Sequence, residues 1–227
     1  MSLKDLLRDA TGTVRIPPGR YYEQLKLVGR KDLRIEAAGV VLDGSRAPKG
    51  QSGVRLQNCE GVEVEALTVT GWNAKAGTGG HAYFATDCRT LKLIDCYGHD
   101  CDGSGVLTGS CSDVLIRGGN WHDFGSHCVY FSNGGRALRV EGATCARAGR
   151  CGVQANGRPK RMEHVRVVDC VFIHCRNVAV QMAFVTDGLV SGCRGQGNRA
   201  PGVTFWDDGA GKRGQCVECR ESGNTWA

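Results

Sequence analysis

Residues 104–140 read SGVLTGSCSDVLIRGGNWHDFGSHCVYFSNGGRALRV, and one pattern occurs twice within this stretch. Each copy has a small-residue segment that ends in a valine, Val106 or Val129. An alternating apolar segment follows eight or nine residues later, at Val114–Ile116 or Leu138–Val140. Successive side chains of a strand point to opposite sides, so each copy predicts short strands with one buried side.

The same two segments recur along most of the chain. The alternating segment occurs at Leu33–Ile35, Val62–Val64, Leu91–Leu93, Val114–Ile116, Leu138–Val140, Val165–Val167 and Leu189–Ser191. The other occurs at Ser52–Val54, His81–Tyr83, Ser104–Val106, His127–Val129, Cys151–Val153, Val178–Val180 and Pro201–Val203, with Ala82 taken as the buried residue of its row. Both series advance by 23 to 29 residues, so they drift together. A period of this length predicts a solenoid.

A rung of about 24 residues without an intervening helix predicts an all-β fold, a right-handed single-stranded parallel β-helix of about nine rungs. An open solenoid end needs a cap. Residues 2–10 predict a short capping helix, with Ser2 as N-cap and Leu3, Leu6 and Leu7 on one face. We therefore expect one domain over residues 1–227, with a cap at 1–12 and rungs at 13–227.

Composition limits the partners. The net charge of +6 favours an anionic partner over a cationic one. The Lys and Arg residues are spread along outward strand positions rather than clustered, which disfavours nucleic acid. No apolar run is long enough to span a membrane, and no signal peptide is visible, so secreted, periplasmic, virion-associated and cytoplasmic locations all stay open. The chain has 13 Cys, and their rung positions predict mostly buried, reduced thiols.

The chain resembles the carbohydrate-binding and sugar-hydrolysis β-helix repeat proteins of the wider pectate-lyase-like superfamily. The residues that carry the resemblance are Gly105–Ser110 and His127–Asn133, each followed by an alternating strand. The entry Val14–Tyr21 is also similar to the start of phage tail-spike β-helices. The resemblance implies that the Gly-Val segment is the first strand of each rung and that the loop before it builds the active site.

Outward positions on that first strand would stack into a wall that suits sugar rings. The expected rows are Arg55, Tyr83, Leu107, Tyr130, Gln154, Gln181 and Thr204, then Gln57, Ala85, Gly109, Ser132, Asn156, Ala183 and Trp206. Of these, Tyr83, Gln154, Asn156, Gln181 and Trp206, with the following Asp207, are the predicted substrate-binding residues. The alternative is a solvated face with incidental tyrosines.

The loops before the wall hold titratable groups. Counting back seven residues from Val106 and Val129 gives His99 and His122, so these histidines are expected one above the other on adjacent rungs. Lysis of a uronan needs a base, a cation at the carboxylate and an acid. His127 or His122 is the expected base, Arg150 or Arg147 the cation, and Tyr130 the acid. A C5-epimerase would start with the same proton abstraction.

Other chemistries stay open. Asp102 and Asp123 are the better carboxylate pair for hydrolysis. Together with Asp100 they could instead supply oxygens to Ca²⁺ as a cofactor. The sequence therefore predicts a carbohydrate-active protein acting on an acidic polysaccharide by lyase or C5-epimerase chemistry. The alternative is a non-catalytic carbohydrate-binding or tail-spike-like module.

Overall fold

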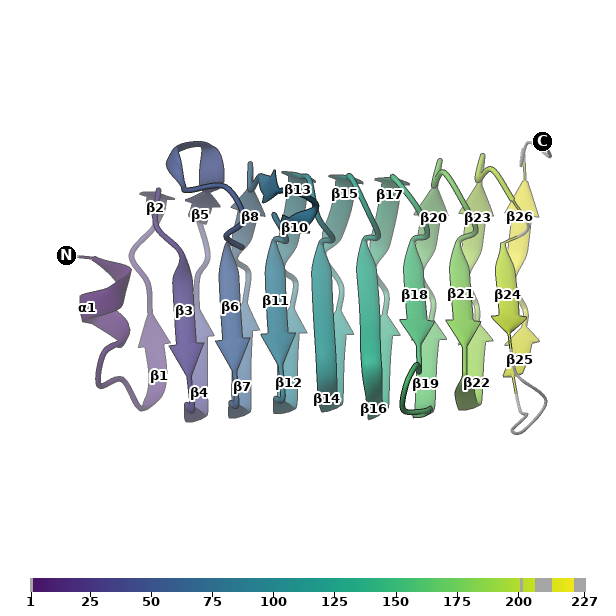
Figure 1. Cartoon of the computed structure of the whole chain (residues 1–227), viewed down its shortest axis with the longest axis horizontal. Coiled ribbons are helices and arrows are strands. Elements are labelled where there is room, and N and C mark those ends of the chain that lie inside the picture. The colour runs from purple at the N-terminus through teal and green to yellow at the C-terminus, as the bar shows by residue number, and fades with distance from the viewer. Residues whose placement is uncertain (1, 201, 207–213, 223–227) are drawn as a thin grey trace.

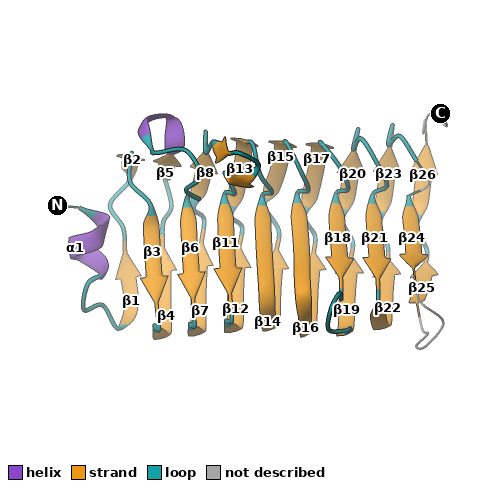
Figure 2. Ribbon diagram, viewed as in Figure 1, coloured by secondary structure: helices purple, strands orange, loops and turns teal. Residues whose placement is uncertain are grey.

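The strands stack in parallel into a β-solenoid with three faces, as Figure 1 shows. The computed structural model describes residues 2–200, 202–206 and 214–222. Eight turns are complete, and a ninth holds two strands. Strands account for nearly all regular structure, and the only α-helix among the described residues lies at the N-terminal end (Figure 2). The predicted all-β parallel β-helix is confirmed.

Face 1 is formed by the first strand of each predicted rung. Its strands are β3 (Leu25–Val28), β6 (Val54–Gln57), β11 (Tyr83–Thr86), the first parts of β14 (Val106–Arg117) and β16 (Val129–Glu141), β18 (Val153–Asn156), β21 (Val180–Ala183) and β24 (Val203–Trp206). Face 2 continues in the same sheet, because β14 and β16 run through the corner between the two faces. Its other strands are β1 (Gly12–Arg15), β4 (Lys31–Glu36), β7 (Glu60–Glu65), β12 (Arg89–Ile94), β19 (Met162–Val168), β22 (Val185–Ser191) and β25 (Gly214–Val217).

Face 3 is a separate sheet of nine strands. They are β2 (Gly19–Tyr21), β5 (Val40–Asp43), β8 (Thr68–Thr70), β13 (Tyr97–Cys101), β15 (Asn120–Phe124), β17 (Thr144–Ala148), β20 (Val171–Ile173), β23 (Arg194–Gln196) and β26 (Arg220–Ser222). Each turn leaves face 3 through a loop and enters face 1. One of these loops carries the antiparallel hairpin of β9 (Ala74–Lys75) and β10 (Thr78–Gly79), and another carries the 3₁₀ turn η1 (Gly44–Arg46).

Two rows of the repeat differ by one residue from the prediction. Tyr83, and not Ala82, pairs with Val54 and Val106, so its side chain points inward. In the seventh alternating segment, Gly188 pairs with Val165, so Leu189 points outward and Val190 fills the core. A shift of one residue exchanges the two faces of a strand, so both corrections change which side chains are buried.

The cap forms as predicted, although α1 is shorter (Leu3–Leu7). The Ser2 hydroxyl accepts a hydrogen bond from the Asp5 N–H at 3.1 Å and donates to the Asp5 carboxylate at 2.7 Å. Leu3 and Leu7 are buried against the first turn. Arg30 donates to the Leu7 carbonyl at 2.6 Å and closes the other end of the helix.

The core is a column of stacked inward side chains. Valine and leucine are its commonest residues, and Trp72, Trp121, Tyr83, Phe131 and Phe172 are its largest buried members. Eleven cysteines are buried, whereas Cys216 is exposed and Cys219 is half-buried. Cys59, Cys88 and Cys111 stack at the corner between faces 1 and 2, where the Cys88 and Cys111 thiols accept the Cys59 and Cys88 N–H groups. The predicted burial of most cysteines is confirmed. No helix in the part of the chain that the structure describes has the length and apolar character of a membrane span.

Candidate functional site

A groove of about 650 Å³ lies over the start of face 1, where the β9–β10 hairpin rises beside it. Its lining residues are Gln24, Lys26, Gly50, Gln51, Ser52, Arg55, Gly77, Thr78, Gly79, His81, Phe84, Ser104, Leu107, Ser126 and Tyr130. A second hollow of about 540 Å³ lies against α1 and shares Gln24, Lys26 and Gln51 with it. The concave surface therefore runs along the solenoid from Tyr130 towards the cap. We call the first hollow the face 1 groove.

Backbone contacts fix the hairpin wall of the groove. Gly50 donates to the Asn73 carbonyl, and Gly80 donates to the Gln51 carbonyl, both at 2.8 Å. Gly79 has a φ of +73°, and a Cβ there would lie 2.0 Å from the Gly50 oxygen, so only glycine fits this position. Asp102 accepts from the Ala74 N–H at 3.0 Å and ties the hairpin to the next turn.

The outward row of face 1 forms the floor of the groove from Lys26 to Tyr130 and continues beyond it, and it combines cations, aromatic rings and amides. The strand register places one outward residue of each turn in a row, which reads Lys26, Arg55, Phe84, Leu107, Tyr130, Gln154, Gln181 and Thr204. The Arg55 guanidinium lies 5.6 Å from the centroid of the Phe84 ring, a cation–π contact. Gln154 donates to the Gln181 side-chain oxygen at 2.7 Å. Such a row offers charge to carboxylates, ring faces to sugars and amides to hydroxyls.

The prediction that Tyr83 belongs to this wall is wrong. Tyr83 is only 2% exposed, and its hydroxyl donates to the Leu67 carbonyl at 2.8 Å. Phe84 takes the outward position, and by the same shift Thr86 replaces Ala85 in the second row. Sequence analysis also missed His81, whose position one residue before a buried pair matches that of His127.

His81 and His127 occupy equivalent corners two turns apart. His81 accepts the Ser104 N–H through Nδ1 at 2.9 Å, and His127 accepts the Cys151 N–H through Nδ1 at 3.2 Å. Burial lowers the pKa of each to about 4, and for His127 the positive charge of Arg150 adds to this effect. Both imidazoles are therefore neutral near pH 7. Since Nδ1 accepts a hydrogen bond, the proton is on Nε2.

This tautomer bears on the expected role of His127. A ring with its proton on Nε2 can donate a hydrogen bond from that atom but cannot accept a proton there. His127 is also only 2% exposed. Its ring centroid lies 5.0 Å from that of Tyr130, so it supports the tyrosine from beneath. Of this pair, Tyr130 is the one that lines the groove.

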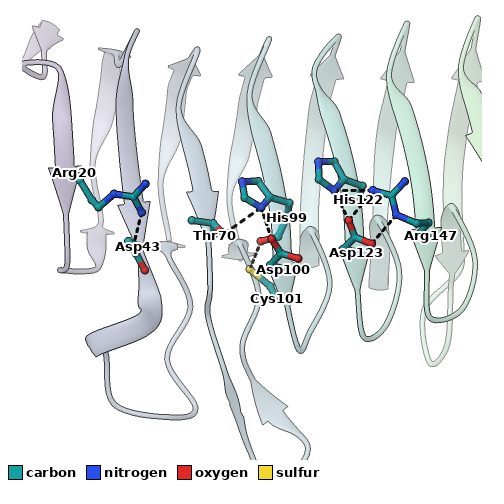
Figure 3. A network of polar contacts seen from close by, with 9 residues as sticks. All are labelled: Arg20, Asp43, Thr70, His99, Asp100, Cys101, His122, Asp123 and Arg147. Atoms are coloured by element: carbon teal, nitrogen blue, oxygen red, sulfur yellow. Dashed lines mark hydrogen bonds and ion pairs between the residues drawn. The ribbon is translucent and has the colours of Figure 1, made fainter.

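His99 and His122 lie on face 3, away from the face 1 groove, whose lining includes neither (Figure 3). They pair across β13 and β15, and their rings stack with centroids 5.1 Å apart and planes 10° apart. The predicted stacking on adjacent rungs is confirmed. Each ring contacts the carboxylate of the next residue through Nδ1, His99 with Asp100 at 2.7 Å and His122 with Asp123 at 2.6 Å.

A left-handed backbone explains these Asp–His pairs. Consecutive strand residues normally point to opposite sides. Asp100 and Asp123 have φ values of +52° and +58°, so each carboxylate stays on the outward side beside the preceding histidine. Arg147 binds both Asp123 oxygens at 2.7 Å. This pairing, helped by His122, holds the pKa of Asp123 at about 2.

The remaining predicted residues are dispersed. Arg150 is exposed next to the corner of His127, Asn156 caps its own turn by accepting the Arg158 N–H, and Trp206 is 63% exposed at the end of β24. Asp207 lies outside the described residues. Asp100, Asp102 and Asp123, the predicted calcium oxygens, contact a histidine, the hairpin backbone and Arg147 respectively. No group of three or more His, Cys, Asp or Glu side chains that could hold a metal ion occurs within the described ranges.

A family model described as a right-handed beta helix region matches residues 52–216. The chain belongs to the right-handed β-helix family. The match covers the groove lining from Ser52 onward and the face 3 histidines, but not Gln24, Lys26, Gly50 and Gln51. A search of curated proteins finds no match to this β-helix.

Two solved structures share the fold at low sequence identity. The alginate lyase from Paenibacillus sp. str. FPU-7 is 12% identical with a TM-score of 0.64, and the match covers 99% of this chain and 96% of the lyase. The Dettilon tailspike protein is 13% identical with a TM-score of 0.61, and the match covers 96% of this chain and 54% of the tailspike. The TM-scores show that the three proteins share the β-helix fold, and at identities this low the similarity shows the fold alone.

Proposed function

We propose that this β-helix binds an acidic polysaccharide along the face 1 groove and acts on it by lyase or C5-epimerase chemistry. The observation that carries the proposal is the row of Lys26, Arg55, Phe84 and Tyr130 along one concave strand face. A glycan chain laid along the solenoid would meet one outward side chain per turn. Structural similarity to an alginate lyase is consistent with this substrate class.

The roles follow from what each group can do. Arg55 and Lys26 carry the positive charge that would neutralise a uronate carboxylate and stabilise its enolate. The Tyr130 hydroxyl is the groove group that can give a proton to the leaving oxygen, as predicted, and in its ionised form could take the proton at C5. His81 would donate a hydrogen bond from Nε2 to a bound hydroxyl or carboxylate.

A second candidate is non-catalytic binding of the same glycan. The observation that favours it is the tautomer of His81 and His127, because neither presents an unprotonated nitrogen to the groove. Binding through the cationic and aromatic row would need no base.

The two candidates separate in one set of assays. Lysis of pectate, alginate or a glycosaminoglycan creates an unsaturated uronate that absorbs in the ultraviolet, and epimerisation exchanges the C5 proton in heavy water. We expect Tyr130→Phe to lower turnover by on the order of 10²-fold or more, the scale of a lost acid–base group. Tyr97→Phe, which removes the hydroxyl of an exposed tyrosine on face 3 outside the groove, is the matched control. Binding without lysis or exchange would establish the non-catalytic module, and no binding to any of the glycans would refute both.

A further inference from the structure

The stacked histidines of face 3, which lie outside the face 1 groove, each contact a carboxylate through Nδ1. The distance from Nδ1 to the carboxylate oxygen is 2.7 Å in His99–Asp100 and 2.6 Å in His122–Asp123. An ionised carboxylate only accepts hydrogen bonds, so the proton between the two groups belongs to Nδ1. The neutral rings therefore carry an unprotonated Nε2. This is the opposite tautomer to that of His127.

The orientation of the two rings is set by further contacts. Thr70 Oγ1 lies 3.1 Å from His99 Nδ1, and Arg147 binds the Asp123 carboxylate through two nitrogens. Arg147 Nη2 also lies 3.2 Å from His122 Nδ1, but the Asp123 oxygen is much nearer to that atom, at 2.6 Å, and is the partner that takes its proton. Histidines that bind metal ions usually donate the other ring N–H to a carboxylate or carbonyl, which fixes the tautomer and raises the basicity of the ligand. Both face 3 histidines already have this second partner. Their side chains remain 31% and 26% exposed, so an ion can reach them.

We propose that His99 and His122 form a two-histidine site for one divalent transition-metal ion of borderline softness, such as Ni²⁺ or Zn²⁺. The ion would bind the two Nε2 atoms, and water would fill its other positions. Imidazole ligands suit this class of ion, whereas Ca²⁺ and Mg²⁺ prefer oxygen.

The spacing sets what binding requires. Ring centroids 5.1 Å apart and planes only 10° apart keep the two Nε2 atoms about one rung from each other. Two metal–nitrogen bonds of about 2.1 Å span at most about 4.2 Å. The rings must therefore lean towards each other at their outer edges when an ion binds. Both side chains lie outside the hydrophobic core, so this movement leaves the core packing unchanged.

His164 provides a matched control within the same chain. It makes the same kind of contact, Nδ1 to the Asp187 carboxylate at 2.6 Å, and it is 53% exposed. No second histidine stacks on it in the described structure. A single Asp–His pair can thus be compared with two stacked pairs on one scaffold.

Titration of the folded chain with Ni²⁺ by isothermal calorimetry tests the proposal. We expect one ion per chain, with affinity lowered at least about 10-fold by His99→Ala and by His122→Ala but changed less than about twofold by His164→Ala. Asp100→Asn should weaken binding by about 10- to 100-fold, the usual effect of a lost second partner. Paramagnetic broadening by Ni²⁺ should affect the His99 and His122 imidazole signals of the wild type first, which tests the site without any substitution.

Four results would contradict the proposed metal site. Absence of Ni²⁺ binding, equal broadening of all six histidines, or wild-type affinity in His99→Ala and His122→Ala would overturn the site. A Cys216→Ser/Cys219→Ser variant that loses the ion would assign the binding to these two thiols instead, and would also overturn the proposal.

Discussion

Tyr83 is the residue at which the observed strand register makes the sharpest prediction. Its ring packs edge-on against Trp121 with centroids 5.5 Å apart, and the whole side chain is only 2% exposed. Truncation of a buried aromatic ring costs about 3–5 kcal/mol, so Tyr83→Ala should lower the free energy of unfolding by that amount. For a chain of this size, about 2–4 °C of melting temperature corresponds to each kcal/mol, giving a drop of roughly 6–20 °C.

Tyr83→Phe removes only the hydrogen bond from the Tyr83 hydroxyl to the Leu67 carbonyl and keeps the ring. The Leu67 carbonyl that accepts from the Tyr83 hydroxyl also accepts the Tyr97 N–H at 2.9 Å, so it keeps a partner when the hydroxyl is removed. We expect a loss of only about 0.5–1.5 kcal/mol, the net value of one hydrogen bond. This conservative variant keeps the test valid if Tyr83→Ala does not fold.

Tyr130→Ala is the matched outward tyrosine on the same face. Surface substitutions usually change stability by about 0.5 kcal/mol or less, so this variant should cost far less than Tyr83→Ala. Chemical denaturation followed by circular dichroism measures all three variants. If Tyr83→Ala cost no more than Tyr130→Ala, the inward register of β11 would be refuted, and the sequence-based wall that included Tyr83 would be restored.

Three further predictions follow from other contacts. The pKa of His127 is lowered to about 4 in the folded chain, from about 6.5 in the unfolded chain. The contribution of the neutral His127 to the free energy of unfolding should therefore be complete above pH 6.5 and decrease as the pH falls towards 4. His127→Asn should make the free energy of unfolding less dependent on pH in this range. A thiol reagent should react rapidly with Cys216 and Cys219 in the native protein and with all 13 cysteines only after denaturation; rapid native reaction at most sites would contradict the buried column. Asp102→Ala should free the β9–β10 hairpin and weaken glycan binding several-fold without lowering the melting temperature by more than about 2 °C, because Asp102 is exposed.

The repeat was predictable from the sequence wherever rungs have equal length. From Val106 to Val129 the rung is 23 residues, so counting back seven residues identifies His99 and His122 as stacked partners, which the register confirms. The rung before Tyr83 contains the hairpin, and two adjacent aromatic residues, Tyr83 and Phe84, satisfy the alternation equally well. The register of the seventh alternating segment was predicted wrongly for a related reason. Its inward residue is Gly188, and a glycine at a core position gives no apolar signal in the sequence.

The site was less predictable because its chemistry depends on hydrogen-bond direction. His127 and His122 are both histidines near a corner, yet one accepts a backbone N–H through Nδ1 and the other donates to a carboxylate. The difference arises from the left-handed φ of Asp123, which brings the carboxylate to the side of the ring. Residue spacing carries no information on that rotation.

The β9–β10 hairpin shows how such a protein can acquire new specificity. The loop from Gly71 to Gly80 makes the turn from Val54 to Tyr83 six residues longer than the next turn, from Tyr83 to Val106, yet β6, β11 and β14 keep continuous pairing. Selection can therefore change the length and chemistry of a corner loop without altering the scaffold that supports it. Loop exchange at this corner is a natural route by which one β-helix framework diversifies to different glycans, and the same corner is the place to graft designed recognition loops.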